Sequence, residues 1–351
     1  MVPVEPGSDA VLLDDTVERL LRATCTFAAV EAAEAPGWCE PVWRALAEAG
    51  LPWVSVAESA GGSGGSLTDA LIVVRRCGQY AAPVPIAETG IIGGWLLESG
   101  ALPVPAGPVA VIPDAHALRV ANGRVTGTAR VAWAAAAHVI AALVAGPDGW
   151  IIVSARPEQL EITRRANLAG EPRDDVRVDV RLADVQSSAA PDGVDSDALR
   201  RRGALARIMM MAGATEAMSQ MTIDYAHGRY QFGRPIAAFQ AVQQHLVIVA
   251  QAAVRIGVAA ELAARAAATG DARLEIATAK VIADRSTVEG TRAAHQVHGA
   301  MGVTREYRLH HLSRRLWAWR HEYGRAREWR REIGSAAVAA GPDNLFPLIT
   351  G

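Results

Sequence analysis

Two segments in the last third of the chain decide the fold: YAHGRYQFGRPI at residues 225–236, followed by FQAVQ at residues 239–243, and QVHGAMGVTREY at residues 296–307. Each segment stands at the end of a long run whose apolar residues recur at helical spacing. The spacing predicts three long helices, at residues 205–229, 240–268 and 272–298. Long helices with a continuous apolar stripe are typical of a helix bundle.

The residues before this bundle fall into two parts with different patterns. Residues 11–100 have helical spacing of apolar residues, including a helix over residues 41–49 that stops before Gly50, a typical C-cap glycine. Residues 109–185 instead contain short β-branched runs between Gly, Pro and Asp, which predict a small antiparallel β domain. Its strands are expected at residues 109–112, 125–131, 138–144, 150–153 and 176–180.

The expected fold is therefore α+β and mostly α. We expect an N-terminal α-helical domain over residues 1–105, a middle β domain over residues 106–187 and a C-terminal helical bundle over residues 188–351. A chain of 351 residues is long enough for two or three domains with well-buried cores.

Composition and charge exclude several classes of protein. The formal net charge is −2, so the whole chain lacks the basic signature of a nucleic-acid-binding protein. Cys25, Cys39 and Cys77 are an odd set without CxxC spacing or a nearby His/Cys cluster, so we expect neither disulfides nor a metal site.

The first fifteen residues are acidic, unlike a signal peptide, and every apolar run is interrupted before it could span a membrane. A cytoplasmic protein is expected.

The two decisive segments resemble the C-terminal signatures of acyl-CoA dehydrogenases, in the order and at the separation typical of that family. Residues 51–66 and 82–89 are also similar to its N-terminal helical domain. The resemblance implies an acyl-CoA dehydrogenase-like fold whose C-terminal part is a four-helix bundle. The chain resembles the short actinobacterial subunits that form heteromeric acyl-CoA dehydrogenases, and this resemblance implies FAD as cofactor.

The residue types in these segments suit a flavin dinucleotide. Arg229 stands where a helix gives way to a turn, and a guanidinium can hold a pyrophosphate with two parallel hydrogen bonds. Phe232 offers a flat apolar face, Gln296 offers an amide, and the turn after His298 lets backbone approach a ligand. The resemblance assigns cofactor contacts to Arg229, Phe232, Phe239, Gln240, Gln296, Val297, His298, Gly299 and Ala300. In the family these elements touch an FAD bound mainly by a neighbouring subunit, which implies an oligomer.

The catalytic base of the family is not found at its usual place. Family members abstract the α-proton of an acyl-CoA with a glutamate while a hydride passes to the flavin. A gap-free match puts this position at Tyr323, whose phenol is protonated at neutral pH. Glu322 is the fallback candidate, although one residue on a helix turns a side chain by about 100°. Some relatives carry the base early in the first bundle helix, but residues 202–205 include no carboxylate.

The middle domain departs from the family as well. The Thr-Glu-Pro stretch that ends in Gly-Ser-Asp is missing, and the Trp-containing strand that helps to hold the flavin ring is only faintly echoed around Trp133. The chain thus has residues to clasp part of a dinucleotide and lacks several that run the chemistry.

The function expected first is a subunit of an FAD-dependent acyl-CoA dehydrogenase, catalytically incomplete and paired with a homologous subunit in an α2β2 heterotetramer. The FAD would be shared with that partner or mainly held by it. The resemblance implies an acyl-CoA substrate and electron-transfer flavoprotein as acceptor. Three alternatives remain: a self-sufficient homomeric dehydrogenase that uses Glu322, a silent subunit that stabilises its partner, and a relative that has left acyl-CoA chemistry, as nitroalkane oxidases have.

Overall fold

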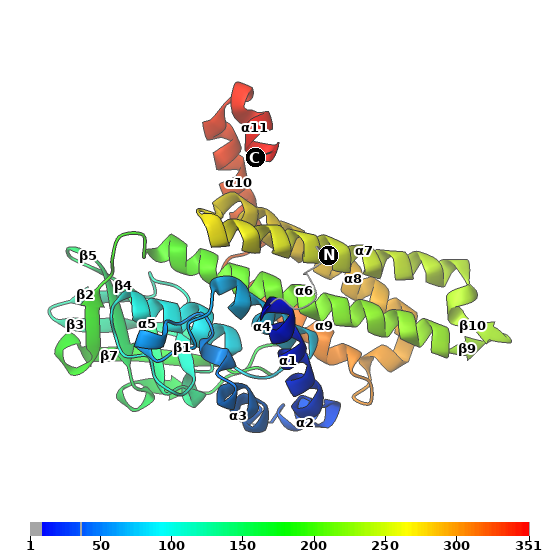
Figure 1. Ribbon diagram of the computed structural model, residues 1–351, viewed down its shortest axis with the longest axis horizontal. Coiled ribbons are helices and arrows are strands. Elements are labelled where there is room, and N and C mark those ends of the chain that lie inside the picture. Colours follow the sequence, from blue (N-terminus) through cyan, green and yellow to red (C-terminus); the bar gives the residue numbers. More distant parts are fainter. Residues whose placement is uncertain (1–8, 36, 351) are drawn as a thin grey trace.

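The computed structural model describes residues 9–35 and 37–350, and it has three parts in chain order. Figure 1 shows short N-terminal helices along one side, a β-sheet at one end and long helices that run the length of the molecule. The N-terminal helices are α1 (Asp9–Thr24), α2 (Phe27–Ala32), α3 (Glu40–Glu48), α4 (Leu67–Gln79) and α5 (Trp95–Ser99), with 3-10 turns at Leu51–Trp53 and Glu58–Ala60 and a π-helical segment, η3, at Ala87–Gly94.

Helix α4 begins at a reciprocal cap that ends the glycine-rich segment before it. The Ser66 hydroxyl accepts a hydrogen bond from the Asp69 N–H at 3.2 Å, and the Asp69 carboxylate accepts one from the Ser66 N–H at 2.9 Å. Two otherwise unpaired N–H groups are satisfied in this way. Farther along, α4 crosses α6 (Ser196–Gly228), and a Cβ at Gly213 would lie 2.0 Å from the Arg75 carbonyl oxygen. Glycine at this crossing lets the two helices approach closely.

The middle part is an eight-stranded sheet in the order β6-β7-β3-β2-β4-β5-β8, with β1 beside β4. Its strands are β1 (Val109–Val111), β2 (Leu118–Ala121), β3 (Arg124–Ala132), β4 (Val139–Gly146), β5 (Gly149–Ala155), β6 (Glu161–Thr163), β7 (Arg173–Arg181) and β8 (Gln186–Ala189). The predicted antiparallel pairing holds for most neighbouring strands, but β4 pairs in parallel with β1 and β2. Strand β3 reverses the chain and the next turn reverses it again, so β4 runs in the same direction as β2.

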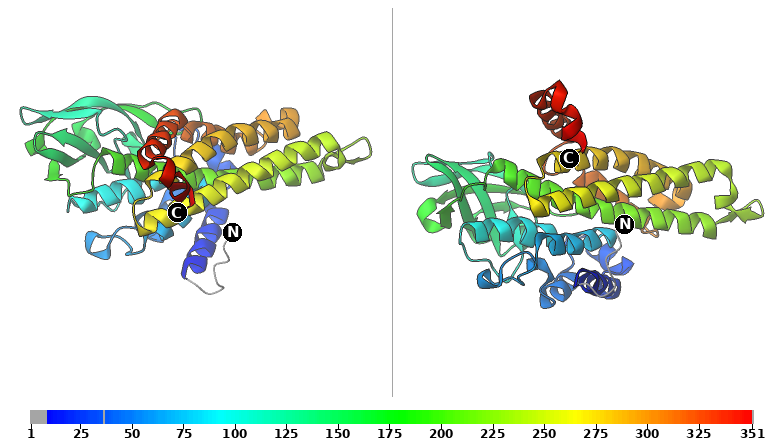
Figure 2. Two further views of the ribbon diagram at one scale, coloured as in Figure 1. Left: turned by 90° about the horizontal axis from the view of Figure 1, so that it is seen from above. Right: turned by 45° about the horizontal axis from the view of Figure 1, so that its top comes forward.

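The third part is the bundle of α6, α7 (Gln240–Thr269), α8 (Arg273–His298) and α9 (Leu309–Trp319). The first of these helices starts nine residues before its predicted start, because the Asp195 carboxylate caps it by accepting a hydrogen bond from the Ala198 N–H at 2.7 Å. One apolar core joins the bundle to the N-terminal helices, and a second lies within the sheet. Helices α10 (Ala326–Ala340) and α11 (Leu345–Thr350) form an arm that projects from the bundle (Figures 1 and 2).

Among the described residues, α7 is the one helix long and apolar enough to cross a membrane, with a mean hydropathy of 1.8 in its most apolar window. It packs along α6 and α8, so it is a helix of the bundle. Only 33% of that window is buried. Its outer face exposes large apolar side chains: Val247, Val254, Val258 and Leu262.

Candidate functional site

The two segments that suggested a cofactor site meet at one end of the bundle. The first forms the end of α6 and a hairpin of β9 (Tyr230–Gln231) and β10 (Arg234–Pro235), which is seen at the right of Figure 1. The second forms the end of α8 and the 3-10 turn η8 (Gly299–Val303). A small apolar core of Ala226, Ala237 and Val297 joins them, and the Tyr225 hydroxyl donates a hydrogen bond to the His298 carbonyl oxygen at 3.4 Å.

Most of the residues predicted to bind the cofactor are exposed to solvent at this end. The exposed ones are Arg229, Phe232, Gln240, Gln296, Gly299 and Ala300. Phe232 is 91% exposed and has a φ of +52°, a conformation that is uncommon for a bulky residue. Within the described ranges, the Arg229 guanidinium has no hydrogen bond or ion pair. An unpaired guanidinium, an exposed ring and a free amide are groups suited to contact with a ligand or a partner.

Three predicted residues are more enclosed. Phe239 is half-buried, packs edge-on against Phe232 at 6.1 Å between ring centroids, and lies beneath the Arg234 guanidinium at 4.2 Å. Val297 lies in the small core. His298 is buried, stacks on Tyr225 at 4.3 Å, and has its Nδ1 2.8 Å from the Ala294 carbonyl oxygen. Burial lowers the pKa of His298, so its ring is neutral at neutral pH.

The position expected for the base lies in the middle of the molecule, just after α9. The Tyr323 backbone has a φ of +55°, and its ring packs against α6 at Gly203. The ring of Tyr323 thus lies against residues 202–205, the other stretch at which a base was expected. Burial raises the pKa of the Tyr323 hydroxyl far above neutral pH, so the phenol keeps its proton.

Glu322, the fallback base, is held between two arginines. Its Oε1 accepts hydrogen bonds from Arg173 Nε at 2.8 Å and Nη2 at 2.5 Å, and its Oε2 accepts one from Arg207 Nε at 2.6 Å. Burial alone would raise the pKa of Glu322, but the two guanidiniums outweigh it and lower the pKa to about 2. The carboxylate is charged at neutral pH, and both of its oxygens are engaged.

The two arginines and Glu322 form a clamp, which belongs to a larger buried network of charged side chains that joins all three parts of the fold. Arg207 also pairs with Glu88 of η3, and Arg173 of β7 also pairs with Glu171 at 3.3 Å. Three carboxylates face three guanidiniums, because Arg315 lies 3.3 Å from Glu171. Charges buried in this way are tolerated when they are paired and hydrogen-bonded. This network was not predicted from the sequence, although Arg207 inside the apolar run of residues 204–214 was a signal of a buried ion pair.

Lys280 fixes the chain next to the clamp. Its ammonium donates hydrogen bonds to the carbonyl oxygens of Arg320 at 3.1 Å and Glu322 at 2.8 Å. Burial lowers the pKa of this lysine to about 8. The backbone that carries Glu322 and Tyr323 is thereby tied to α8.

In the Trp133 segment of the middle domain, a backbone N–H group is already paired with a side chain of the same chain. Trp133 is buried with a φ of +61°, and the Ala135 N–H donates a hydrogen bond to the Asp174 carboxylate at 2.9 Å. A cleft of about 510 Å³ lies beside this turn, between the sheet and the N-terminal helices, and Trp38 and Arg165 line it. Neither Glu322 nor Tyr323 lines this cleft.

Comparison with known proteins identifies this architecture. Residues 8–101 match the acyl-CoA dehydrogenase N-terminal domain, and residues 200–335 match the acyl-CoA dehydrogenase C-terminal domain. Acyl-CoA dehydrogenase IpdE2 of Mycobacterium tuberculosis is 31% identical over 318 residues, which are 87% of this chain and 90% of that protein. Acyl-CoA dehydrogenase FadE34 of the same organism is 29% identical over 89% of this chain, but over only 44% of its own length.

A solved structure has the same fold. A chain of the ChsE4-ChsE5 complex from Mycobacterium tuberculosis superposes with a TM-score of 0.86 over 95% of this chain and 98% of that chain, at 22% identity. The predicted fold, with a helical part on either side of a β-sheet, is confirmed. The chain belongs to the acyl-CoA dehydrogenase family of FAD-dependent oxidoreductases.

Proposed function

We propose that this chain is the catalytically incomplete subunit of a heteromeric, FAD-dependent acyl-CoA dehydrogenase. The observation that carries the proposal is the occupied base position, with the Tyr323 ring against Gly203 and Glu322 between Arg173 and Arg207. Abstraction of an α-proton needs a carboxylate that faces the substrate and has a suitable proton affinity. A carboxylate with a pKa of about 2 and two arginine partners is a weak base.

The cofactor residues support a divided site. Arg229 and Gln296 suit the pyrophosphate and nucleotide end of FAD, whereas the Trp133 segment has its Ala135 N–H bonded to Asp174 and offers little to the ring. Arg207 and Arg229 lie about 33 Å apart along α6, at ~1.5 Å per residue. An FAD touched by Arg229 is therefore remote from Glu322 of the same chain. When bound, FAD accepts the hydride, and the base for that reaction would come from the partner.

The exposed face of α7 supports a partner chain. Val254, Val258 and Leu262 are 63%, 51% and 55% exposed, and contiguous apolar surface of this kind marks protein interfaces. FadE34 is matched over 44% of its length, which leaves room in one polypeptide for a second chain of this size. We therefore infer a homologous acyl-CoA dehydrogenase subunit as partner, in an α2β2 heterotetramer, with an acyl-CoA substrate and electron-transfer flavoprotein as acceptor in the cytoplasm.

Purification with and without the partner tests this proposal. The chain is produced alone and together with the proposed homologous subunit, and the flavin spectrum of each sample is recorded before and after addition of acyl-CoA. We expect little or no FAD in the isolated chain and an FAD in the complex that acyl-CoA bleaches. An isolated chain that holds stoichiometric FAD and is bleached by acyl-CoA would instead support the homomeric enzyme.

A further inference from the structure

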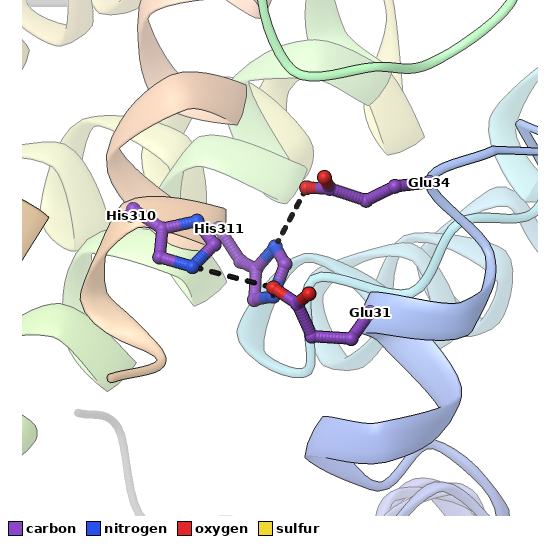
Figure 3. Close-up of side chains that lie close together, drawn as sticks. All are labelled: Glu31, Glu34, His310 and His311. Carbon is purple, nitrogen blue, oxygen red and sulfur yellow. Dashed lines mark ion pairs between the residues drawn. The ribbon is translucent and has the colours of Figure 1, made fainter. Parts of the chain in front are cut away.

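A second group of titratable side chains lies apart from the Glu322 network, where α2 meets the start of α9. Glu31 belongs to α2 and Glu34 follows it, while His310 and His311 belong to the first turn of α9. Figure 3 shows the four side chains pointing toward one another across the junction of the two helices. One ligand atom from each lies within 4.8 Å of those from the other three.

A carboxylate oxygen of Glu31 lies close to one ring nitrogen of each histidine. Glu31 Oε1 lies 3.0 Å from His311 Nε2 and 3.4 Å from His310 Nε2. In a tetrahedral zinc site with bonds of ~2.0–2.2 Å, neighbouring ligand atoms lie about 3.3–3.5 Å apart. The two helices thus hold an oxygen and two imidazole nitrogens close to the arrangement that a zinc ion requires.

The same three atoms lack hydrogen bonds. Among residues 9–35 and 37–350, Glu31 Oε1, His310 Nε2 and His311 Nε2 are buried and have no hydrogen-bond partner, and His311 is fully buried. A buried polar atom without a partner costs about 1–3 kcal/mol, so such atoms are rare in folded proteins. Three that converge on one point indicate a shared partner, and a cation satisfies all three at once.

The surrounding groups favour the ligand form of the histidines. His311 Nδ1 lies 3.5 Å from Glu34 Oε1, and histidines that bind a metal commonly donate their other ring N–H to a carboxylate. Glu34 is in turn held by an ion pair with Arg314.

We propose that Glu31, His310 and His311 bind one divalent transition-metal ion, best matched by Zn²⁺, and that Glu34 positions His311 through its Nδ1. Two imidazoles and a carboxylate are a ligand set that suits zinc. The ion would link α2 of the N-terminal helices to α9 of the bundle. This site is independent of the proposed dehydrogenase function.

An arrangement without metal competes for the same groups. Arg314 Nη2 lies 3.3 Å from His310 Nδ1 and 3.5 Å from His311 Nδ1. If both rings accept from Arg314, their protons are on Nε2 and face Glu31. A metal on Nε2 instead requires the protons on Nδ1, so Arg314 keeps only its ion pair with Glu34. Removal of Arg314 takes away the hydrogen-bond donor of the metal-free arrangement and leaves the three proposed zinc ligands in place.

The test measures zinc binding by the untagged full chain. Protein is equilibrated with Zn²⁺ and dialysed, bound zinc is counted by mass spectrometry, and the Kd is measured by competition with a chromophoric chelator. We expect one zinc per chain in the wild type and in the control His116→Asn/His138→Asn, which removes two exposed imidazoles of the β domain. Affinity should fall at least 100-fold in His310→Asn/His311→Asn and in Glu31→Gln, and about 10- to 100-fold in Glu34→Gln. Arg314→Gln should retain zinc.

Two results would overturn the site: a wild type that holds no stoichiometric zinc at micromolar concentration, or equal zinc in the wild type and in His310→Asn/His311→Asn. Because the histidine variants could fail to fold, the wild type is also loaded with Co²⁺. X-ray absorption should then find two imidazoles among nitrogen and oxygen ligands. Sulfur ligands or an all-oxygen shell would assign the metal to another place.

Discussion

The ring of Tyr323 packs against the backbone of Gly203 so closely that a Cβ at residue 203 would lie 2.2 Å from ring atoms Cδ1 and Cε1. The two residues are 120 positions apart in the chain; Tyr323 is the expected position of the base, and Gly203 belongs to the stretch 202–205 that was the alternative. A carboxylate on α6 at this point and the tyrosine ring would need the same space. This contact supports the proposal that the base comes from a partner chain.

Gly203→Ala should destabilise the chain, because the new methyl group collides with the half-buried ring of Tyr323. Overpacking of this kind costs about 1–3 kcal/mol. Gly334→Ala in α10 is the matched control, since a Cβ there meets nothing within 4 Å and alanine favours a helix. Urea unfolding of both variants measures the difference. Equal stabilities would mean that the Tyr323 ring moves aside at little cost.

The long helices were predictable from sequence because their apolar residues repeat with the helical period over many turns. The start of α6 was missed because residues 196–204 are mainly polar, and the helix begins there through the Asp195 cap. Strands β2, β6 and β8 were missed because they have only four, three and four residues, and β8 is largely exposed. The parallel pairing of β1 with β4 depends on contacts between distant segments, which a local pattern does not contain.

The candidate sites also differ in whether their residues lie close together in the sequence. The cofactor-binding residues could be proposed from sequence because they lie within two contiguous segments. The clamp on Glu322 could not be proposed in this way, because Glu88, Arg173 and Arg207 come from three different parts of the chain. The cluster of Glu31, His310 and His311 was not predicted for a similar reason, because Glu31 and His311 are adjacent only in the folded protein.

Arg229→Ala should weaken FAD binding in the assembled complex without loss of fold stability. A hydrogen bond to a charged group contributes about 1.5–3 kcal/mol, so the Kd should rise about 10- to 150-fold. Arg229→Lys should rescue only part of this loss, because an ammonium cannot form two parallel hydrogen bonds to a pyrophosphate. Fluorescence titration with FAD measures the Kd, and thermal unfolding serves as the control. Unchanged affinity in both variants would assign Arg229 to a purely structural role.

Glu322→Gln should destabilise the isolated chain, because it leaves Arg173 and Arg207 without a shared counter-charge. Removal of one partner of a buried ion pair costs about 3–5 kcal/mol. Glu158→Gln, at an exposed glutamate of the β domain, is the control and should be close to neutral. A free energy of unfolding equal to that of the wild type would mean that the clamp contributes no net stability.

The stability that Glu322 provides should depend on pH. Its pKa is lowered from 4.5 to about 2 in the folded chain, so the contribution is fully present above about pH 4.5 and is lost as the pH falls toward 2. The shift corresponds to about 3 kcal/mol. The difference in unfolding free energy between wild type and Glu322→Gln should therefore shrink by about this amount between pH 6 and pH 2. A difference that stays constant over this range would contradict a charged, clamped carboxylate.

Turnover separates a clamped Glu322 from a catalytic one. If the base belongs to the partner subunit, Glu322→Gln should leave the rate of flavin reduction in the assembled enzyme within a few fold of the wild type. A true general base contributes about 10²- to 10⁴-fold, so the two outcomes are well separated. Stopped-flow reduction of bound FAD by acyl-CoA isolates the chemical step from product release.

Because the same substitution weakens the fold, FAD content and subunit stoichiometry are measured on the sample used for this assay. The Arg207 and Arg173 contacts would have to open before Glu322 could reach a substrate, and each guanidinium holds a different oxygen. A rate at least a hundredfold lower in a complex with full FAD content and intact assembly would make Glu322 the base. It would also overturn the assignment of proton abstraction to the partner chain.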